Sequence, residues 1–133
     1  MENIEKIMDE GEIIAVVVRK EAKLKGVNFF TPLDFSQQLG LLVHEKGKII
    51  KAHKHKHIKR EIFLTQEVLV VLEGKVKIEL YNEKHQKIKS IIITRGDTIL
   101  LASGAHSIEI MKDSKIIEVK QGPYAGADDK EFI

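Results

Sequence analysis

Apolar and polar residues alternate along most of this chain with the period of two that a β-strand produces. In residues 75–81, KVKIELY, Val76, Ile78 and Leu80 share one face and polar residues occupy the other. Comparable apolar or β-branched runs are EIIAVVVRK, NFFTP, QQLGLLVHE, KIIKAHKHKH, QEVLVVLEG, KIKSIIIT, TILLA, HSIEIM and KIIEVKQ. Turn residues separate these runs at intervals of about ten residues, which predicts about nine or ten short strands in an all-β antiparallel sandwich or barrel.

The two ends of the chain depart from this pattern. Residues 1–11, MENIEKIMDEG, place Ile4, Ile7 and Met8 on one helical face before Gly11, which predicts a short N-terminal helix or a loosely attached arm. Residues 122–133, GPYAGADDKEFI, are rich in turn residues and then polar, so we expect a tail that packs across a barrel edge or fills its mouth. The length of 133 residues predicts a single domain, 1–133.

Composition narrows the class of protein. The chain is 43% hydrophobic and 32% charged, which is sufficient for a core and a soluble surface. It has no cysteine, and hence no disulfide or thiolate ligand, and no apolar run long enough for a membrane span. Its start lacks the features of a signal peptide, so we expect a cytoplasmic protein. A net charge of +2 and few aromatic residues argue against a nucleic-acid partner.

Residues 51–60, KAHKHKHIKR, contain three alternating histidines. In a strand, His53, His55 and His57 lie on one face and the lysines between them on the other. Imidazoles two residues apart can bind one divalent metal ion. The alternative is a basic, solvated edge strand, in which lysines also prevent pairing with other chains.

The spacing of these histidines resembles the two signature motifs of the cupin superfamily. Gly47 is followed by five residues and then His53-Lys-His55, Glu67 is followed by six residues and then Gly74, and GDTILLASGAH ends in His106. The resemblance covers roughly residues 36–120 and implies a jelly-roll β-barrel. It implies that His53, His55, Glu67 and His106 bind one divalent ion, such as Zn, Mn, Fe or Ni. Residues 56–66, between His55 and Glu67, form an insertion relative to the family pattern and are expected to be a loop or an extra hairpin.

A narrower resemblance concerns function. KREIFLTQEVLVVLEGKVKIELY and IIEVKQGPYAG are similar to small cupins associated with polysaccharide or sugar-nucleotide metabolism. This implies a small-molecule-handling protein with a carbohydrate-related ligand. One alternative is a metal-free sugar-nucleotide isomerase or epimerase in which His53 or His55 is the acid–base catalyst, and another is a non-enzymatic binding module.

Further contacts are expected around this site. Arg60, His57 and Gln38 are candidate substrate contacts, and a guanidinium suits a phosphate or carboxylate. Small cupins commonly pair through sheet edges, and the stretches VLVVL and SIIIT, apolar on both faces, fit a homodimer.

Overall fold

The computed structural model describes residues 2–133 and is nearly all β, with 48% of residues in strands and 3% in a helix. The predicted all-β antiparallel class is therefore confirmed. The elements in chain order are β1 Ile4–Asp9, β2 Glu12–Val18, β3 Gly26–Phe29, β4 Gly40–Val43, β5 Glu67–Tyr81, β6 Lys87–Thr94, β7 Thr98–Leu101, β8 Ala105–Lys120 and the 3-10 helix η1 Gly126–Asp129.

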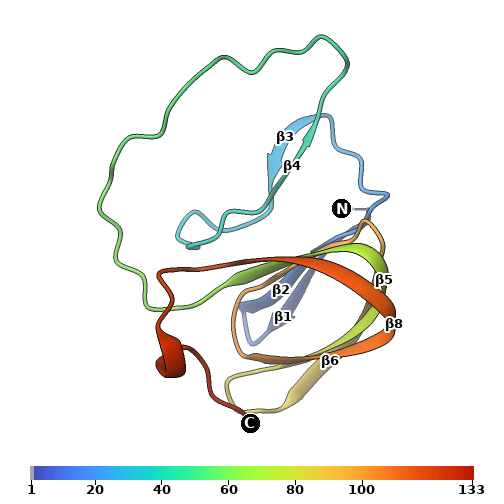
Figure 1. Ribbon diagram of the computed structural model, residues 1–133, viewed down its shortest axis with the longest axis vertical. Helices are drawn as coiled ribbons and strands as arrows, with labels where there is room; N and C mark the ends of the chain where they lie inside the picture. Colours follow the sequence, from blue (N-terminus) through green and yellow to red (C-terminus); the bar gives the residue numbers. More distant parts are fainter. Residues whose placement is uncertain (1) are drawn as a thin grey trace.

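Six strands form one antiparallel sheet in the order β1-β2-β7-β5-β6, with β8 paired to β5. β5 pairs with β8 along most of its length, while its other edge pairs first with β7 and then with β6. The sheet curls strongly into a half-barrel, and Figure 1 shows β5 and β8 wrapping around as a C-shaped ribbon. β3 and β4 form a separate two-stranded sheet.

The bend in the β5–β8 ladder is located at Gly74 and Ser114. The register of the ladder shifts between Val71 and Val76. Gly74 has φ +97°, and a Cβ there would lie 2.2 Å from Ser114 Oγ, so only glycine fits. The Lys75 amide donates a hydrogen bond to Ser114 Oγ at 3.1 Å, which fixes the bend. The expected strand breaks at Gly74 and at residues 112–114 are therefore wrong: they are bulges inside two long strands.

Apolar residues form cores on both faces of the main sheet. The first core fills the inside of the curl, where it contains Leu69, Val71, Ile78 and Ile99. The second core lies on the opposite face; its members, fully or partly buried, are Ile4, Ile13, Val16, Val18, Ala22, Leu24, Phe30, Phe35, Leu39, Leu41, Val68 and Leu100. The two-faced apolar pattern of VLVVL thus reflects cores within this chain, since Val68 packs in the second core and Leu69 in the first.

The expected N-terminal helix is wrong, because residues 4–9 form strand β1. β1 pairs with β2 through a hairpin at Glu10 and Gly11, both of which have positive φ. Ile4 packs in the second core and Ile7 in the first, so their spacing of three serves the two faces of a strand instead of one face of a helix. Residue 1 lies outside the described residues.

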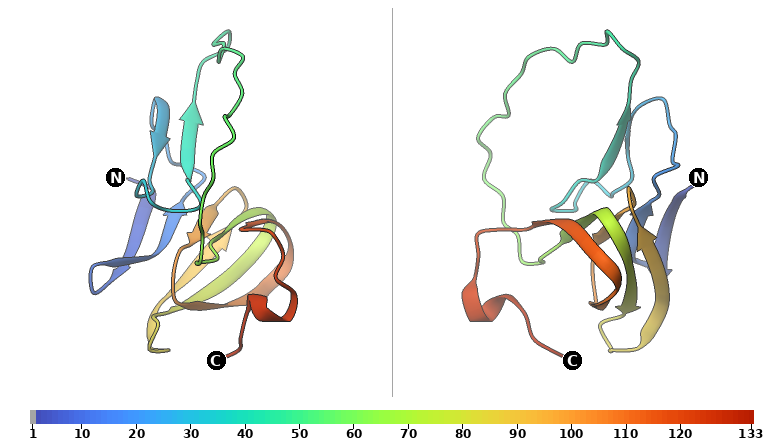
Figure 2. Two further views of the ribbon diagram at one scale, coloured as in Figure 1. Left: turned by 90° about the vertical axis from the view of Figure 1, so that its left-hand side faces the viewer. Right: turned by 45° about the vertical axis from the view of Figure 1, so that its right-hand side comes forward.

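Residues 44–66 contain no helix or strand, so the strand expected at KIIKAHKHKH is also wrong. Residues 44–65 are all exposed, and the segment arches away from both sheets in Figure 1 and in the right-hand view of Figure 2. The loop expected at residues 56–66 is confirmed. Among residues 2–133, no helix has the length and apolar character needed to cross a bilayer.

Candidate functional site

Glu67 and His106 point toward the inside of the half-barrel. Glu67 is the first residue of β5 and alternates with Leu69 and Val71, which belong to the first core. His106 lies near the start of β8, directly opposite Leu80 of the same core. Directly opposed residues of an antiparallel pair project from the same face, so both polar side chains share the concave face.

The two side chains are in direct contact. His106 Nε2 lies 2.8 Å from Glu67 Oε1, and the side chains are 31% and 14% exposed, respectively. Glu67 lies opposite Lys120 at one end of the β5–β8 ladder, whereas His106 lies near the other end. The contact therefore joins the two ends of the curled ladder at the open side of the half-barrel.

A second carboxylate accompanies this pair. Glu118 of β8 lies opposite Leu69, which places it on the concave face near Glu67. The hydrogen bond with His106 lowers the pKa of Glu67 from its ordinary 4.5 to about 2. The hydrogen bond that Glu118 shares with Glu67, together with burial, raises the pKa of Glu118. Two neighbouring carboxyl groups thus differ in their affinity for a proton, an arrangement often found at functional sites.

The three histidines of residues 53–57 lie outside this group. His53, His55 and His57 are exposed on the segment 44–66. The rings of His53 and His55 are neighbours, with centroids 5.4 Å apart, and His53 Nδ1 lies 2.8 Å from the Lys51 carbonyl oxygen. The structure therefore brings the four expected ligands together as two pairs, Glu67 with His106 and His53 with His55. Within residues 2–133, no three His, Asp or Glu side chains form a group that could hold a metal ion.

The candidate substrate contacts Arg60 and Gln38 line a cleft of ≈ 930 Å³ between the loop after β3 and residues 60–66. The Gln38 side chain is fixed within its own loop: its amide nitrogen donates to the carbonyls of Pro32 and Phe35, both at 2.8 Å. Gln121 also lines this cleft. Residues distant in sequence therefore form a concave surface with amide and charged groups, a composition suited to a polar small molecule.

Gln66 is a structural residue of the same cleft. It is 2% exposed, and its side-chain oxygen accepts hydrogen bonds from Ser36 Oγ at 3.2 Å and from the Gln37 amide at 3.1 Å. Its amide nitrogen donates to the Ala102 carbonyl at 3.4 Å. Gln66 therefore attaches the loop before β4 to the main sheet, a role that its position before an apolar strand did not reveal.

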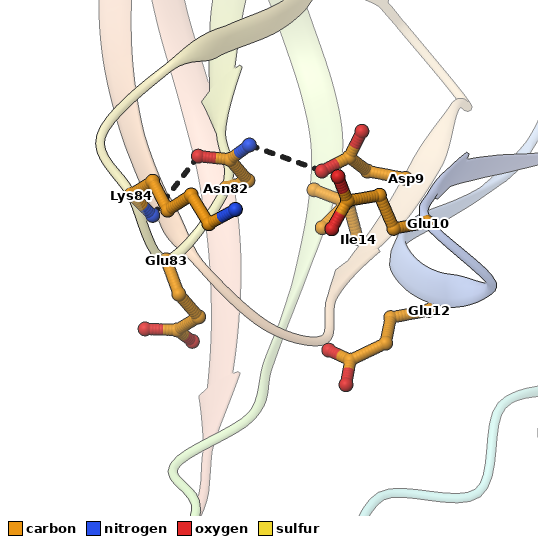
Figure 3. A pocket seen from close by; sticks show the side chains of 7 residues that line it. All are labelled: Asp9, Glu10, Glu12, Ile14, Asn82, Glu83 and Lys84. Atoms are coloured by element: carbon orange, nitrogen blue, oxygen red, sulfur yellow. Dashed lines mark hydrogen bonds between the residues drawn. The ribbon is translucent and has the colours of Figure 1, made fainter.

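A smaller cleft of ≈ 190 Å³ lies between the β1–β2 and β5–β6 turns. Figure 3 shows that acidic side chains from both turns surround it, and that Asn82 donates to Asp9 and accepts from the Lys84 amide. Asn82 also donates to the Gln86 side-chain oxygen and accepts from the Gln86 amide, so it stabilises these two hairpins.

Glu118 is the functional candidate that sequence reasoning missed. The sequence alternation could have identified Glu118, because it has the same strand parity as Ile116, which packs on the first core. A charged residue in register with inward-facing apolar residues indicates a polar interior site.

A scan of protein-family models, a search of curated proteins and a search of solved structures each found no match to this chain.

Proposed function

We propose that this protein handles a small polar molecule at the open side of its half-barrel, in the manner of a cupin, with a divalent metal ion bound at Glu67 and His106. The observation that supports this proposal is the 2.8 Å contact between Glu67 Oε1 and His106 Nε2 on the concave face. The curled antiparallel sheet likewise supports a jelly-roll fold of the cupin type.

The donor atoms fit a divalent ion. Carboxylate oxygen and imidazole nitrogen are ligands of Zn, Mn, Fe and Ni. Two donors about 2.1 Å from one ion lie about 3 Å apart when they are adjacent in an octahedron, close to the separation of these two atoms. The lowered pKa of Glu67 keeps its carboxylate ionised at neutral pH. When bound, such an ion would supply Lewis acidity to polarise a carbonyl or acidify a water molecule.

The cleft beside residues 60–66 supports an oxygen-rich ligand such as a carbohydrate derivative. Gln121 presents an amide nitrogen, which can donate to hydroxyl groups. Arg60 on the same cleft would pair with a phosphate or carboxylate of the ligand. In this proposal Glu67, Glu118 and His106 contact the reacting part of a molecule inside the half-barrel, while the cleft, which Phe35 of the second core lines, takes a polar ligand on the other face of the sheet.

Metal analysis tests this proposal. We expect untagged protein purified without chelator to bind stoichiometric divalent metal, and Glu67→Gln or His106→Ala to lower its affinity by more than about tenfold. His55→Ala tests whether segment 44–66 contributes a ligand. His85→Asn is the matched control, because His85 lies in an exposed turn with φ 64°, a conformation that asparagine tolerates. A wild type without metal affinity, or unchanged affinity in both site variants, contradicts the proposal.

A second candidate is metal-free proton transfer, favoured by the opposite pKa shifts of Glu67 and Glu118. In this case Glu67 and Glu118, whose affinities for a proton differ, exchange a proton with the ligand beside His106. The test is a panel of sugar nucleotides incubated in heavy water. Solvent deuterium should enter one ligand with wild type and not with Glu118→Gln. Binding without exchange throughout the panel would leave a non-enzymatic binding module as the better description.

We also propose that two copies of the chain associate. In the described residues the outer edge of β8 has no partner strand, and the exposed residues beside it include Met111, Ile117 and Val119. Long unpaired edges with apolar side chains are sites of strand pairing. Light scattering should give a dimeric mass for wild type and a monomeric mass for Val119→Lys; a monomeric wild type contradicts the proposal.

A further inference from the structure

Residues 122–133 lie at the open side of the half-barrel. They leave the end of β8, form η1 and continue along the side where the C-shaped ribbon is open (Figures 1 and 2). Asp129 Oδ2 is 3.0 Å from Lys120 Nζ, and the Asp129 side chain is only 10% exposed. The Lys120 ammonium also lies 5.6 Å from the centre of the Tyr124 ring. This segment is therefore attached through Lys120, the residue opposite Glu67.

Beyond this attachment, the segment has exposed apolar residues. Phe132 is 92% exposed, with Lys130 Nζ 5.9 Å from the centre of its ring, and Ile133 is 60% exposed. The concave face has exposed apolar residues as well: Ile108 is 41% and Ile110 is 56% exposed. Ile108 and Ile110 lie opposite Ile78 and Val76 of the first core, so they border the inside of the curl.

The attachment places these two groups at the same end of the curl. Lys120 lies opposite Glu67, which contacts His106, and Ile108 is two residues further along β8. Phe132 is three residues after Asp129, a span of up to about 10 Å when extended. While Asp129 stays bound to Lys120, Phe132 and Ile133 therefore remain near the Glu67–His106 contact.

We propose that residues 122–133 form a strap that closes over the Glu67–His106 site by packing Phe132 and Ile133 on Ile108 and Ile110. Closure removes apolar surface from water on both sides and excludes water from the site. Access of a ligand is then regulated by the Lys120–Asp129 ion pair, which positions the strap. This inference adds a gate to the site of the proposed function and rests on that function for its purpose.

The strap is tested without metal or ligand. The chain has no cysteine, so Phe132→Cys accepts a single nitroxide label. The label should broaden the methyl signals of Ile108 and Ile110 in NMR spectra, and Asp129→Asn should weaken this broadening. Unaffected Ile108 and Ile110 signals overturn the strap, whatever the metal analysis shows.

Chemical access to His106 provides a second measurement that retains the native segment length. Carbethoxylation of histidines is followed residue by residue by mass spectrometry, with exposed His85 as the internal reference. If the strap is closed for roughly 70–90% of the time, Phe132→Ser with Ile133→Ser should raise the His106 rate by about three- to tenfold relative to His85. An unchanged ratio contradicts closure.

Discussion

The Glu67 carboxylate and the His106 imidazole join the two ends of the β5–β8 ladder, since Glu67 lies opposite Lys120 and His106 lies opposite Leu80. The half-barrel is thus held by a polar contact at the place where its proposed chemistry occurs. This relationship makes the pH dependence of stability a test of the site.

The stability of the protein should depend on pH through Glu67 and Glu118. Because folding lowers the pKa of Glu67 from 4.5 to about 2, its stabilisation is present above pH 4.5 and is lost as the pH falls toward 2. The raised pKa of Glu118 acts in the opposite direction, so part of the gain is lost again above pH 4.5. We expect the rise from Glu67 in urea unfolding to be at most about 3 kcal/mol, because each pKa unit corresponds to about 1.4 kcal/mol.

Two variants separate these contributions. Glu67→Gln should remove the rise in the free energy of unfolding between about pH 2 and pH 4.5. Glu118→Gln should remove the decrease above pH 4.5 and keep the rise. A wild-type profile in both variants would falsify the assignment of this dependence to the concave face.

Gly74→Ala should destabilise the fold by about 3 kcal/mol or more, as measured by chemical denaturation. The new Cβ would lie 2.2 Å from Ser114 Oγ and 2.5 Å from the Asp113 carbonyl oxygen, in addition to a φ of +97°. Gly11→Ala is the matched control, because Gly11 has φ +82° with no atom within 4 Å, and should cost only about 1 kcal/mol. Equal losses in the two variants would show that the close contact with Ser114 is unimportant.

Asp97→Ala should cost about 3–5 kcal/mol, because it leaves Arg19 without its carboxylate in a partly buried position. Asp97 accepts hydrogen bonds from the amides of Lys20 and Thr94 at 2.9 and 3.0 Å and lies 3.2 Å from Arg19. Burial raises the pKa of Asp97, but these bonds outweigh it and the pKa falls below its usual value.

The control for this buried pair is the exposed pair of Lys59 and Glu61, which are 3.7 Å apart and more than two-thirds exposed. Glu61→Gln should change the free energy of unfolding by less than about 0.5 kcal/mol. A small loss for Asp97→Ala, similar to that for Glu61→Gln, would mean that the turn at Asp97 contributes little to the fold.

Gln66→Leu should release the loop before β4 at a cost of about 1–3 kcal/mol, since the Gln37 amide and Ser36 hydroxyl lose their acceptor. Hydrogen exchange should accelerate at residues 36 and 37 more than in β5. Gln86→Leu, in the β5–β6 turn, instead removes the acceptor of the Asn82 side-chain amide, so its effect on exchange should stay within that turn. Unaltered exchange at Gln37 contradicts this role.

The strands with clean alternation were predictable from sequence, and the bends were not. Val76, Ile78 and Leu80 face the first core as their period of two requires. Gly74 and residues 112–114 have the composition of turns, but tertiary pairing between two long strands converts them into bulges. Ile4 and Ile7 were assigned to a helix because a strand buried on both faces also has apolar residues three positions apart.

The candidate site was predictable only in part, because spacing identifies residues and not the path of the chain between them. Glu67 and His106 come together through strand register, which the alternation of β5 and β8 encodes. The conformation of residues 51–60 depends on a partner strand, and alternating Lys and His residues do not specify one. Whether His53 and His55 contribute to metal binding therefore remains a prediction for the metal analysis.

The bulge at Gly74 and Ser114 also determines which changes the architecture tolerates. The ladder bends at this bulge, inside β5 and away from the exposed segment of residues 44–65. Lengthening or shortening that segment should alter how far its basic residues extend into solvent. The curvature of the β5–β8 ladder and the contact between Glu67 and His106 should stay the same. Loop length can therefore diversify independently of the chemistry inside.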